Sequence, residues 1–269
     1  MTPRITALIM AAAAYSFISV GFILQKKGIS WIGWKGRKDR SYFKNLGVWT
    51  AGFILMNGYG IPSAVALTSL PPHIVSAFAG WGIIVLVFLS HLFLRETVRR
   101  SDFFYSLAVI GGIVLMNISE PPVQSETISA DVPTILFFAT PLSVFLCSLI
   151  LLSSDKLKNF FYALVSGCSA GMMVISLKGL VQLHEYRLTE YPGSVYLYLY
   201  IFYAVLSFVS LQISLRTGPV MITGQIQYSM TIIYPYAGLL IVFSGETGVL
   251  QPVSIGLITW GVVKMVKNR

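Results

Sequence analysis

The chain has 269 residues, of which 55% are hydrophobic and only 11% are charged, against about 25% charged residues in an ordinary soluble domain. So few charges cannot cover a water-soluble fold of this length. The net charge of +9 is spread between apolar blocks and does not form the basic stripe of a nucleic-acid-binding domain. The apolar blocks are 15 to 26 residues long, and a helix needs about 20 apolar residues to cross roughly 30 Å of hydrocarbon. Composition therefore predicts an all-α integral membrane protein with no nucleic-acid partner.

Nine apolar blocks follow one another along the chain, and we interpret each as a membrane-spanning helix. They cover residues 5–24, 46–67, 73–94, 103–118, 133–153, 160–183, 194–215, 219–244 and 249–263. The blocks are continuous and lack the alternation that is typical of barrel strands. More basic residues follow the first block than precede it, which is the reverse of a signal peptide, so we expect this block to be retained as a span.

The distribution of basic residues predicts how the spans are oriented. If the N-terminus is outside and the C-terminus is cytoplasmic, every Lys and Arg except Arg4, Lys178 and Arg187 lies in a cytoplasmic segment. Cytoplasmic loops of membrane proteins carry such an excess of Lys and Arg. We therefore expect a multi-pass protein of the cell (cytoplasmic) membrane.

Short matches relate the two halves of the chain in one order and at a nearly constant offset. Lys27-Gly28-Ile29 matches Lys178-Gly179-Leu180, Glu96-Thr97 matches Glu246-Thr247, and residues 112–116 match residues 261–265. An odd number of crossings separates the matched spans, so they run in opposite directions. This pattern predicts an inverted repeat of four plus four helices with the fifth span as a bridging helix. The alternative is that apolar helices resemble each other through composition alone.

The repeat predicts three parts of the chain. Residues 1–132 form the first four-helix repeat and an outer linker, residues 133–159 form the bridging helix and an inner loop, and residues 160–269 form the second, inverted repeat. In transporters with inverted repeats the substrate site lies near the middle of the membrane, between the repeats.

Four segments of the chain carry a family likeness: residues 21–28 (GFILQKKG), residues 89–96 (LSHLFLRE), the glycine-rich fourth span and residues 176–180 (SLKGL). In these segments the chain resembles the drug/metabolite transporter (DMT/EamA) superfamily, and within it the nine-span magnesium-transporter branch of the NIPA type. The resemblance implies a bundle of two inverted four-helix units that moves a small solute by alternating access. The branch further implies transport of Mg²⁺ or another divalent cation. With nine predicted spans, we expect the chain to differ from the superfamily's commoner ten-span pattern by one N-terminal helix.

No acidic residue lies near the middle of a predicted span. Carboxylates normally provide the ligands of dehydrated Mg²⁺ sites and of proton relays. We therefore predict no metal-ligating residues, and the residues favour a neutral, zwitterionic or anionic metabolite as the substrate. Passage of a hydrated Mg²⁺ ion past carbonyl and amide oxygens is the alternative, because Mg²⁺ gives up its waters reluctantly.

Polar residues inside the predicted spans are the candidate substrate-binding residues. Gln225, Tyr228 and Ser229 share one helix face by their three- and four-residue spacing, in a span that Pro235 interrupts. The further candidates are Asn57, Lys178, Gln212 and His73. Each candidate has a structural alternative, since buried amides bind helices together, a lysine near a span end snorkels, and interfacial histidines form ordinary hydrogen bonds. Six glycines are expected to allow close helix contact: Gly80, Gly82, Gly111, Gly112, Gly167 and Gly171.

An integral-membrane enzyme is the second class of function that the sequence allows. Such an enzyme needs paired acids in a loop, a His/Glu metal cluster, an activated nucleophile or a nucleotide-binding loop, and the sequence shows none of these. A helix bundle without transport activity is the third alternative. We expect a transporter with no catalytic residues and no cofactor. Its partners would be a small-molecule or ion substrate and the lipid bilayer, with a homodimer as an open alternative.

Overall fold

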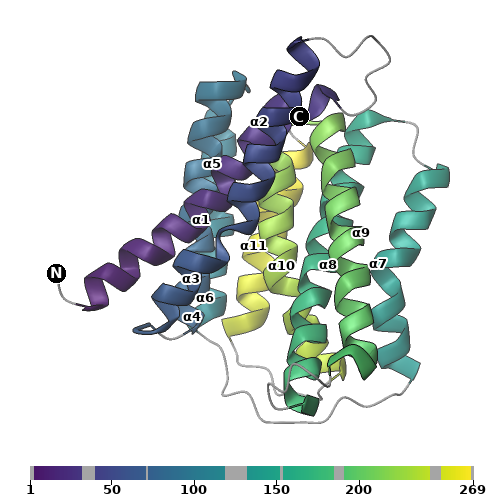
Figure 1. The fold of residues 1–269 in the computed structure, drawn as a ribbon. Coiled ribbons are helices and arrows are strands. Elements are labelled where there is room, and N and C mark those ends of the chain that lie inside the picture. The colour runs from purple at the N-terminus through teal and green to yellow at the C-terminus, as the bar shows by residue number, and fades with distance from the viewer. Residues whose placement is uncertain are drawn as a thin grey trace. The chain divides into compact units, whose positions relative to one another are not determined.

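The computed structural model describes residues 3–31, 40–70, 72–118, 132–151, 154–184, 191–242 and 250–267, and every regular element within these ranges is a helix (Figure 1). The α-helices are α1 Pro3–Gly28, α2 Arg40–Asn57, α3 Gly60–Leu67, α4 Pro72–Ala77, α5 Ala79–Leu94, α6 Arg100–Ile118, α7 Val132–Leu151, α8 Asp155–His184, α9 Val195–Thr217, α10 Val220–Val242 and α11 Leu250–Lys267. Short 3-10 turns lie at Ile29–Trp31 and Tyr191–Gly193. The prediction of an all-helical protein is confirmed for the described part of the chain.

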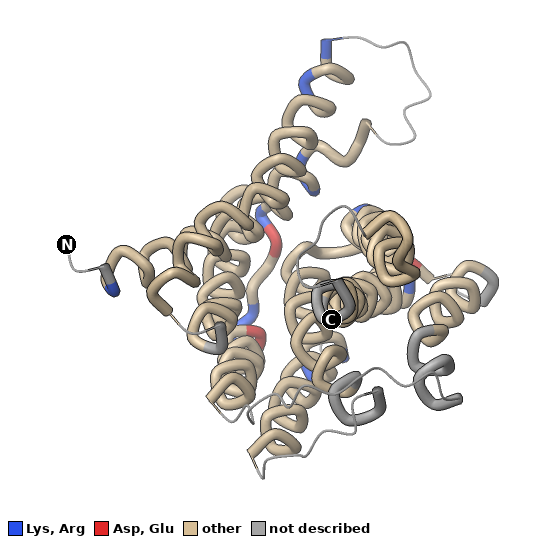
Figure 2. The backbone as a smooth tube through the Cα atoms, turned by 60° about the horizontal axis from the view of Figure 1, so that its bottom comes forward, with Lys and Arg blue, Asp and Glu red and all other residues tan. Residues whose placement is uncertain are grey.

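Six segments among the described residues are long and apolar enough to cross a membrane. They are Arg4–Trp31, Arg40–Leu67, Ile74–Leu94, Arg100–Ile118, Leu157–Leu177 and Val195–Thr217. Lys, Arg, Asp and Glu gather at helix ends and in connecting segments, which leaves long uncharged stretches along the described helices (Figure 2). This distribution agrees with a multi-pass membrane protein, because a charged side chain at the bilayer centre is costly.

Two of the predicted spans are each built from a pair of helices. The predicted span 46–67 is divided into α2 and α3, with a turn at Gly58 and Tyr59. The predicted span 73–94 is divided into α4 and α5 at Phe78, whose backbone N–H donates to the Val75 carbonyl at 3.1 Å. Hydrophobic patterning does not reveal such breaks because both halves of each span are equally apolar.

The described chain divides into two compact units, and the first comprises Met1–Glu120, Gly218–Gln225 and Val249–Arg269. Within it, α1 and α2 approach closely at paired small residues. An added Cβ on Gly21 would lie 2.8 Å from the Gly52 carbonyl oxygen, and one on Gly52 would lie 2.8 Å from the Gly21 carbonyl oxygen. Small residues of this kind let membrane helices bring their backbones together.

Helices α6 and α11 of the first unit also pack through glycine. A Cβ on Gly112 would lie 2.6 Å from Ile258 Cγ1 and 2.9 Å from the Ser254 carbonyl oxygen. A Cβ on the neighbouring Gly111 would meet no atom within 4 Å. The prediction of close helix contact is therefore confirmed at Gly112, and it is wrong at Gly111, which lies on the open side of α6.

This contrast makes a matched pair of substitutions. Gly112→Ala will lower the free energy of unfolding by roughly 1–3 kcal/mol, because the new methyl group overpacks the contact with α11. Gly111→Ala will be neutral or will stabilise by up to about 1 kcal/mol, because Ala is the better helix former. Thermal unfolding of the two detergent-purified variants measures the difference. Equal melting temperatures would contradict the packing of α6 on α11.

The second unit comprises Pro121–Thr217 and Ile226–Gly248. Helices α8 and α9 in this unit are joined by reciprocal hydrogen bonds. The Ser166 hydroxyl donates to the Ser207 carbonyl and the Ser207 hydroxyl donates to the Ser166 carbonyl, each at 2.9 Å. Asn159 Nδ2 donates to the Ser214 carbonyl and the Ser214 hydroxyl donates to the Asn159 carbonyl, again at 2.9 Å.

Helix α8 also packs against the part of α10 that lies in the second unit. A Cβ on Gly167 would lie 2.5 Å from Met230 Cβ and 2.9 Å from the Gln227 carbonyl oxygen. A Cβ on Gly171 would lie 2.7 Å from the ring of Pro235. The predicted role of Gly167 and Gly171 in close helix contact is confirmed, and these two glycines hold the polar segment of α10 against α8.

Candidate functional site

Gln225 lies in the second turn of α10 and is only 1% exposed. Its Nε2 donates to the hydroxyl of Ser106 on α6 at 2.7 Å, within the first unit. Its Oε1 is buried and has no hydrogen-bond partner among the described residues. A buried acceptor without a partner costs about 1–3 kcal/mol. Gln225 therefore carries one structural hydrogen bond and one buried amide oxygen whose hydrogen-bonding capacity the described residues leave unused.

The next turn of α10 carries two more buried oxygens in the same condition. The Gln227 Oε1 and Ser229 Oγ atoms have no hydrogen-bond partner in the described structure, and Ser229 is completely buried. Serine hydroxyls inside helices usually donate to a carbonyl of the preceding turn, as Ser106 does on α6 at 2.8 Å. Neutral oxygens without partners are thus concentrated on this segment of α10.

Pro235 adds a backbone acceptor to the same helix. Proline has no N–H, so the carbonyl of Thr231, four residues earlier, loses its usual helical donor. The Thr231 hydroxyl does not replace the missing donor, because it donates to the Gln227 carbonyl at 2.8 Å. Nevertheless α10 continues through Pro235 as one helix, Val220–Val242, so the predicted interruption of this span is not a break in the helix.

The remaining predicted site residues are placed as follows. Tyr228 on α10 and Gln212 on α9 are buried, at 7% and 8% exposure. Asn57 is exposed at the end of α2, where its Nδ2 donates to the Phe53 carbonyl at 2.8 Å. Lys178 lies in α8 and His73 in α4, but their side chains lie outside the described residues.

A charged cluster at the start of α10 was not among the predicted site residues. The Glu96 carboxylate accepts two backbone N–H groups, from Val220 to Oε1 at 2.7 Å and from Met221 to Oε2 at 3.2 Å. Lys26 Nζ donates to the Gly218 carbonyl at 2.9 Å. The carboxylate thus accepts two N–H groups that have no partner within the helix. Its negative charge also lies at the positive end of the helix dipole, which is favourable. The repeated Glu-Thr and the QKKG segment marked these residues in the sequence, but neither pattern indicated that they meet at α10.

No group of three or more His, Cys, Asp or Glu side chains that could hold a metal ion occurs in the described part of the chain. The candidate site on α10 therefore offers amide, hydroxyl and carbonyl oxygens, which are ligands for a polar solute or for the water shell of a hard cation. Apolar membrane-spanning helices, a helix that contains proline, and buried oxygens without partners among the described residues together indicate a multi-pass membrane protein of the transporter class.

Comparison with known families agrees with this class. Residues 2–248 match the family described as Magnesium transporter NIPA. The chain belongs to the NIPA magnesium transporter family, which is part of the DMT/EamA-like superfamily, and it is a membrane transporter. No curated protein and no solved structure matches the chain.

Proposed function

We propose that this chain transports Mg²⁺ by alternating access, and that the ion passes α10 with most of its water shell in place. The membership in the NIPA magnesium transporter family is the observation that supports Mg²⁺ as the substrate. The neutral oxygens of α10 support passage of a hydrated ion, because bound waters donate hydrogen bonds to amide, hydroxyl and carbonyl acceptors. Removing the waters would require close carboxylate ligands.

The proposed substrate-binding residues are those predicted from the sequence. Gln225, Tyr228 and Ser229 form the centre of the proposal, because two of these side chains carry buried oxygens without partners. Asn57, Lys178, Gln212 and His73 are proposed as further contacts along the pathway. We propose no cofactor and no catalytic residue for this transporter.

The proposed topology has nine spans, with the N-terminus outside and the C-terminus in the cytoplasm. The six candidate spans, taken with α7, α10 and α11, correspond in order to the nine predicted blocks. Two hydrogen bonds support this order: Lys26 donates to the Gly218 carbonyl, and the Val220 N–H donates to Glu96. Lys26, Glu96 and Val220 all belong to the cytoplasmic ends of predicted spans. We retain the inverted repeat of 1–132 and 160–269 around a bridging helix at 133–159, and the cytoplasmic membrane as the location.

A second candidate substrate is a small neutral or zwitterionic metabolite. It is favoured by the absence of a carboxylate cluster from the described residues and by the amide-rich character of α10. The two candidate substrates predict uptake of different solutes by the same purified protein, so one uptake assay distinguishes them.

Mg²⁺ uptake into proteoliposomes that contain an internal Mg²⁺-sensitive dye tests the proposal. We expect saturable uptake, and we expect Gln225→Leu to lower its rate by about tenfold or more, because a buried polar contact of roughly 1–3 kcal/mol is lost. Ser106→Ala is the matched control. It removes the hydrogen bond between α6 and α10 but keeps the free Gln225 Oε1, so its rate should fall by less.

Equal losses in the two variants would assign Gln225 a purely structural role. Absence of Mg²⁺ uptake, together with uptake of an organic solute by the same vesicles, would contradict Mg²⁺ transport and support the second candidate. Uptake of neither class of solute would contradict transport by this chain under both assignments.

A further inference from the structure

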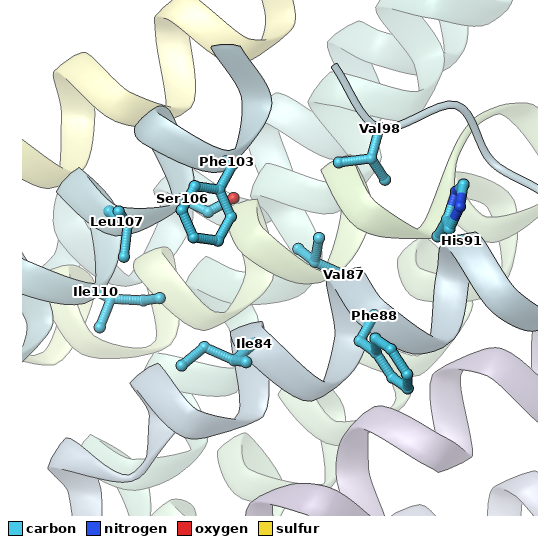
Figure 3. Close-up of a pocket in the computed structure, with 9 residues that line it drawn as sticks. All are labelled: Ile84, Val87, Phe88, His91, Val98, Phe103, Ser106, Leu107 and Ile110. Atoms are coloured by element: carbon cyan, nitrogen blue, oxygen red, sulfur yellow. The ribbon is translucent and has the colours of Figure 1, made fainter. Parts of the chain in front are cut away.

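A groove of about 450 Å³ opens between α5 and α6 in the first unit (Figure 3). Ile84 and Phe88 of α5 line one side, and Phe103, Leu107 and Ile110 of α6 line the other. Almost all of the lining atoms are apolar. The described residues of the site on α10 do not line it, although the wall includes Ser106, whose hydroxyl binds Gln225.

The side chains that form the groove are exposed even though they are large and apolar. Phe88 is 64% exposed, Phe103 is 55% exposed and Leu107 is 45% exposed. The groove lies on two candidate membrane spans, Ile74–Leu94 and Arg100–Ile118. An apolar groove on the surface of a membrane span faces hydrocarbon and not water. The shape and the chemistry of the groove therefore fit an acyl chain.

One end of the groove reaches the connection between α5 and α6. His91 and Val98 line this end, and the connection carries Arg95, Arg99 and Arg100, all of which are exposed. The proposed topology, with the N-terminus outside, puts this connection on the cytoplasmic side. Arginines at that interface attract the anionic headgroups of the cytoplasmic leaflet.

The two acidic residues of the same region both accept hydrogen bonds from backbone N–H groups. Glu96 accepts the N–H groups of Val220 and Met221 at the start of α10. Asp102 is completely buried, and its Oδ2 accepts the backbone N–H of Arg99 at 3.0 Å. The exposed charged side chains of the connection between α5 and α6 are Arg95, Arg99 and Arg100.

We propose that this groove binds an anionic phospholipid, with one acyl chain between α5 and α6 and its phosphate group at Arg95 and Arg100. The chain packs on Ile84, Phe88 and Leu107. The bound lipid stabilises the position of α6, and through Ser106 it supports the orientation of Gln225 on α10. The lipid-binding step is independent of which solute the protein carries.

Thermal unfolding in detergent, with added phosphatidylglycerol or phosphatidylcholine of the same acyl chains, tests the site. We expect phosphatidylglycerol to raise the melting temperature in a saturable way, by roughly 5–10 °C at a hundredfold excess over its Kd, and phosphatidylcholine to raise it less. The double substitution Arg95→Gln and Arg100→Gln will remove the difference between the lipids. Leu107→Trp, which fills the groove, will remove the response to both.

Two control variants separate the groove from the rest of the surface. Phe104 on α6 is 66% exposed but does not line the groove, so Phe104→Trp should keep the full response. Arg216 is an exposed arginine in the last turn of α9, so Arg216→Gln should keep the preference for phosphatidylglycerol.

The proposal is overturned if wild-type protein responds equally to the two lipids, or if Leu107→Trp responds as wild type does. It is also overturned if the wild-type protein is a dimer in detergent and Leu107→Trp makes it monomeric without changing the lipid response, because the groove would then be a contact between two copies. Since the readout is stability, these outcomes are distinct from a failure of Mg²⁺ transport.

Discussion

Glu96→Lys will reduce transport to background and will lower the free energy of unfolding by roughly 3 kcal/mol or more. The wild-type carboxylate accepts the first two N–H groups of α10. A lysine at this position leaves both donors unsatisfied and brings a second positive charge to the positive end of the helix. Transport in proteoliposomes and thermal unfolding in detergent measure the two effects.

The charge-reversed double variant shows whether Glu96 acts as a helix cap or only as an ion-pair partner. Lys26→Glu combined with Glu96→Lys will not restore transport. A carboxylate at position 26 cannot donate to the Gly218 carbonyl, and a lysine at position 96 cannot accept from Val220. The double variant has the same net charge as wild type, so a change of overall charge does not account for its loss of transport. Recovery of wild-type stability and transport in the double variant would contradict the capping role.

Gly167→Leu will prevent α8 from packing on α10 and will abolish transport. Even a single Cβ at this position would lie 2.5 Å from Met230 Cβ and 2.9 Å from the backbone oxygen of Gln227, neither of which is the mobile end of a side chain. A leucine therefore forces the helices apart, with a loss of stability of roughly 3 kcal/mol, the upper part of the range for overpacking. Thermal unfolding and the yield of monodisperse protein measure the loss.

Gly256→Leu is the matched control, because an added Cβ at Gly256 in α11 would meet no atom within 4 Å. This variant will unfold within about 1 kcal/mol of wild type, since leucine is also a better helix former than glycine. If Gly167→Leu is as stable and as active as Gly256→Leu, the contact between α8 and α10 does not exist in the folded protein.

The sequence carried enough information to predict an all-helical membrane protein, and it placed three of the candidate site residues on one segment that the structure describes as part of α10. Membrane spans follow from the length of apolar runs, and the spacing of Gln225 and Ser229 follows from the helix period, so both are local properties. The hydrogen bond of Gln225 to Ser106 joins residues 119 positions apart, and the bond of Val220 to Glu96 joins residues 124 positions apart. No local pattern encodes such pairings.

Two glycines of α6 also show that a local pattern cannot predict contacts between helices. Gly111 and Gly112 are adjacent and equally consistent with close packing, yet only Gly112 meets a neighbouring helix. To predict which glycine contacts the neighbouring helix, one must know how α6 is rotated about its own axis. The nearly uniform apolar surface of α6 does not indicate this rotation. The breaks at Gly58 and Phe78 were missed for a related reason, since the residues on both sides are apolar.

The reciprocal hydrogen bonds of α8 and α9 fix the register of these two helices. Each bonded pair joins a side chain on one helix to a carbonyl on the other, in both directions, so sliding by one residue would break every bond at once. Two helices that pack through apolar side chains alone can slide more easily, because each apolar contact that is lost is replaced by a similar one. We therefore expect the α8–α9 pair to move as one rigid body, with changes of shape at other helix contacts.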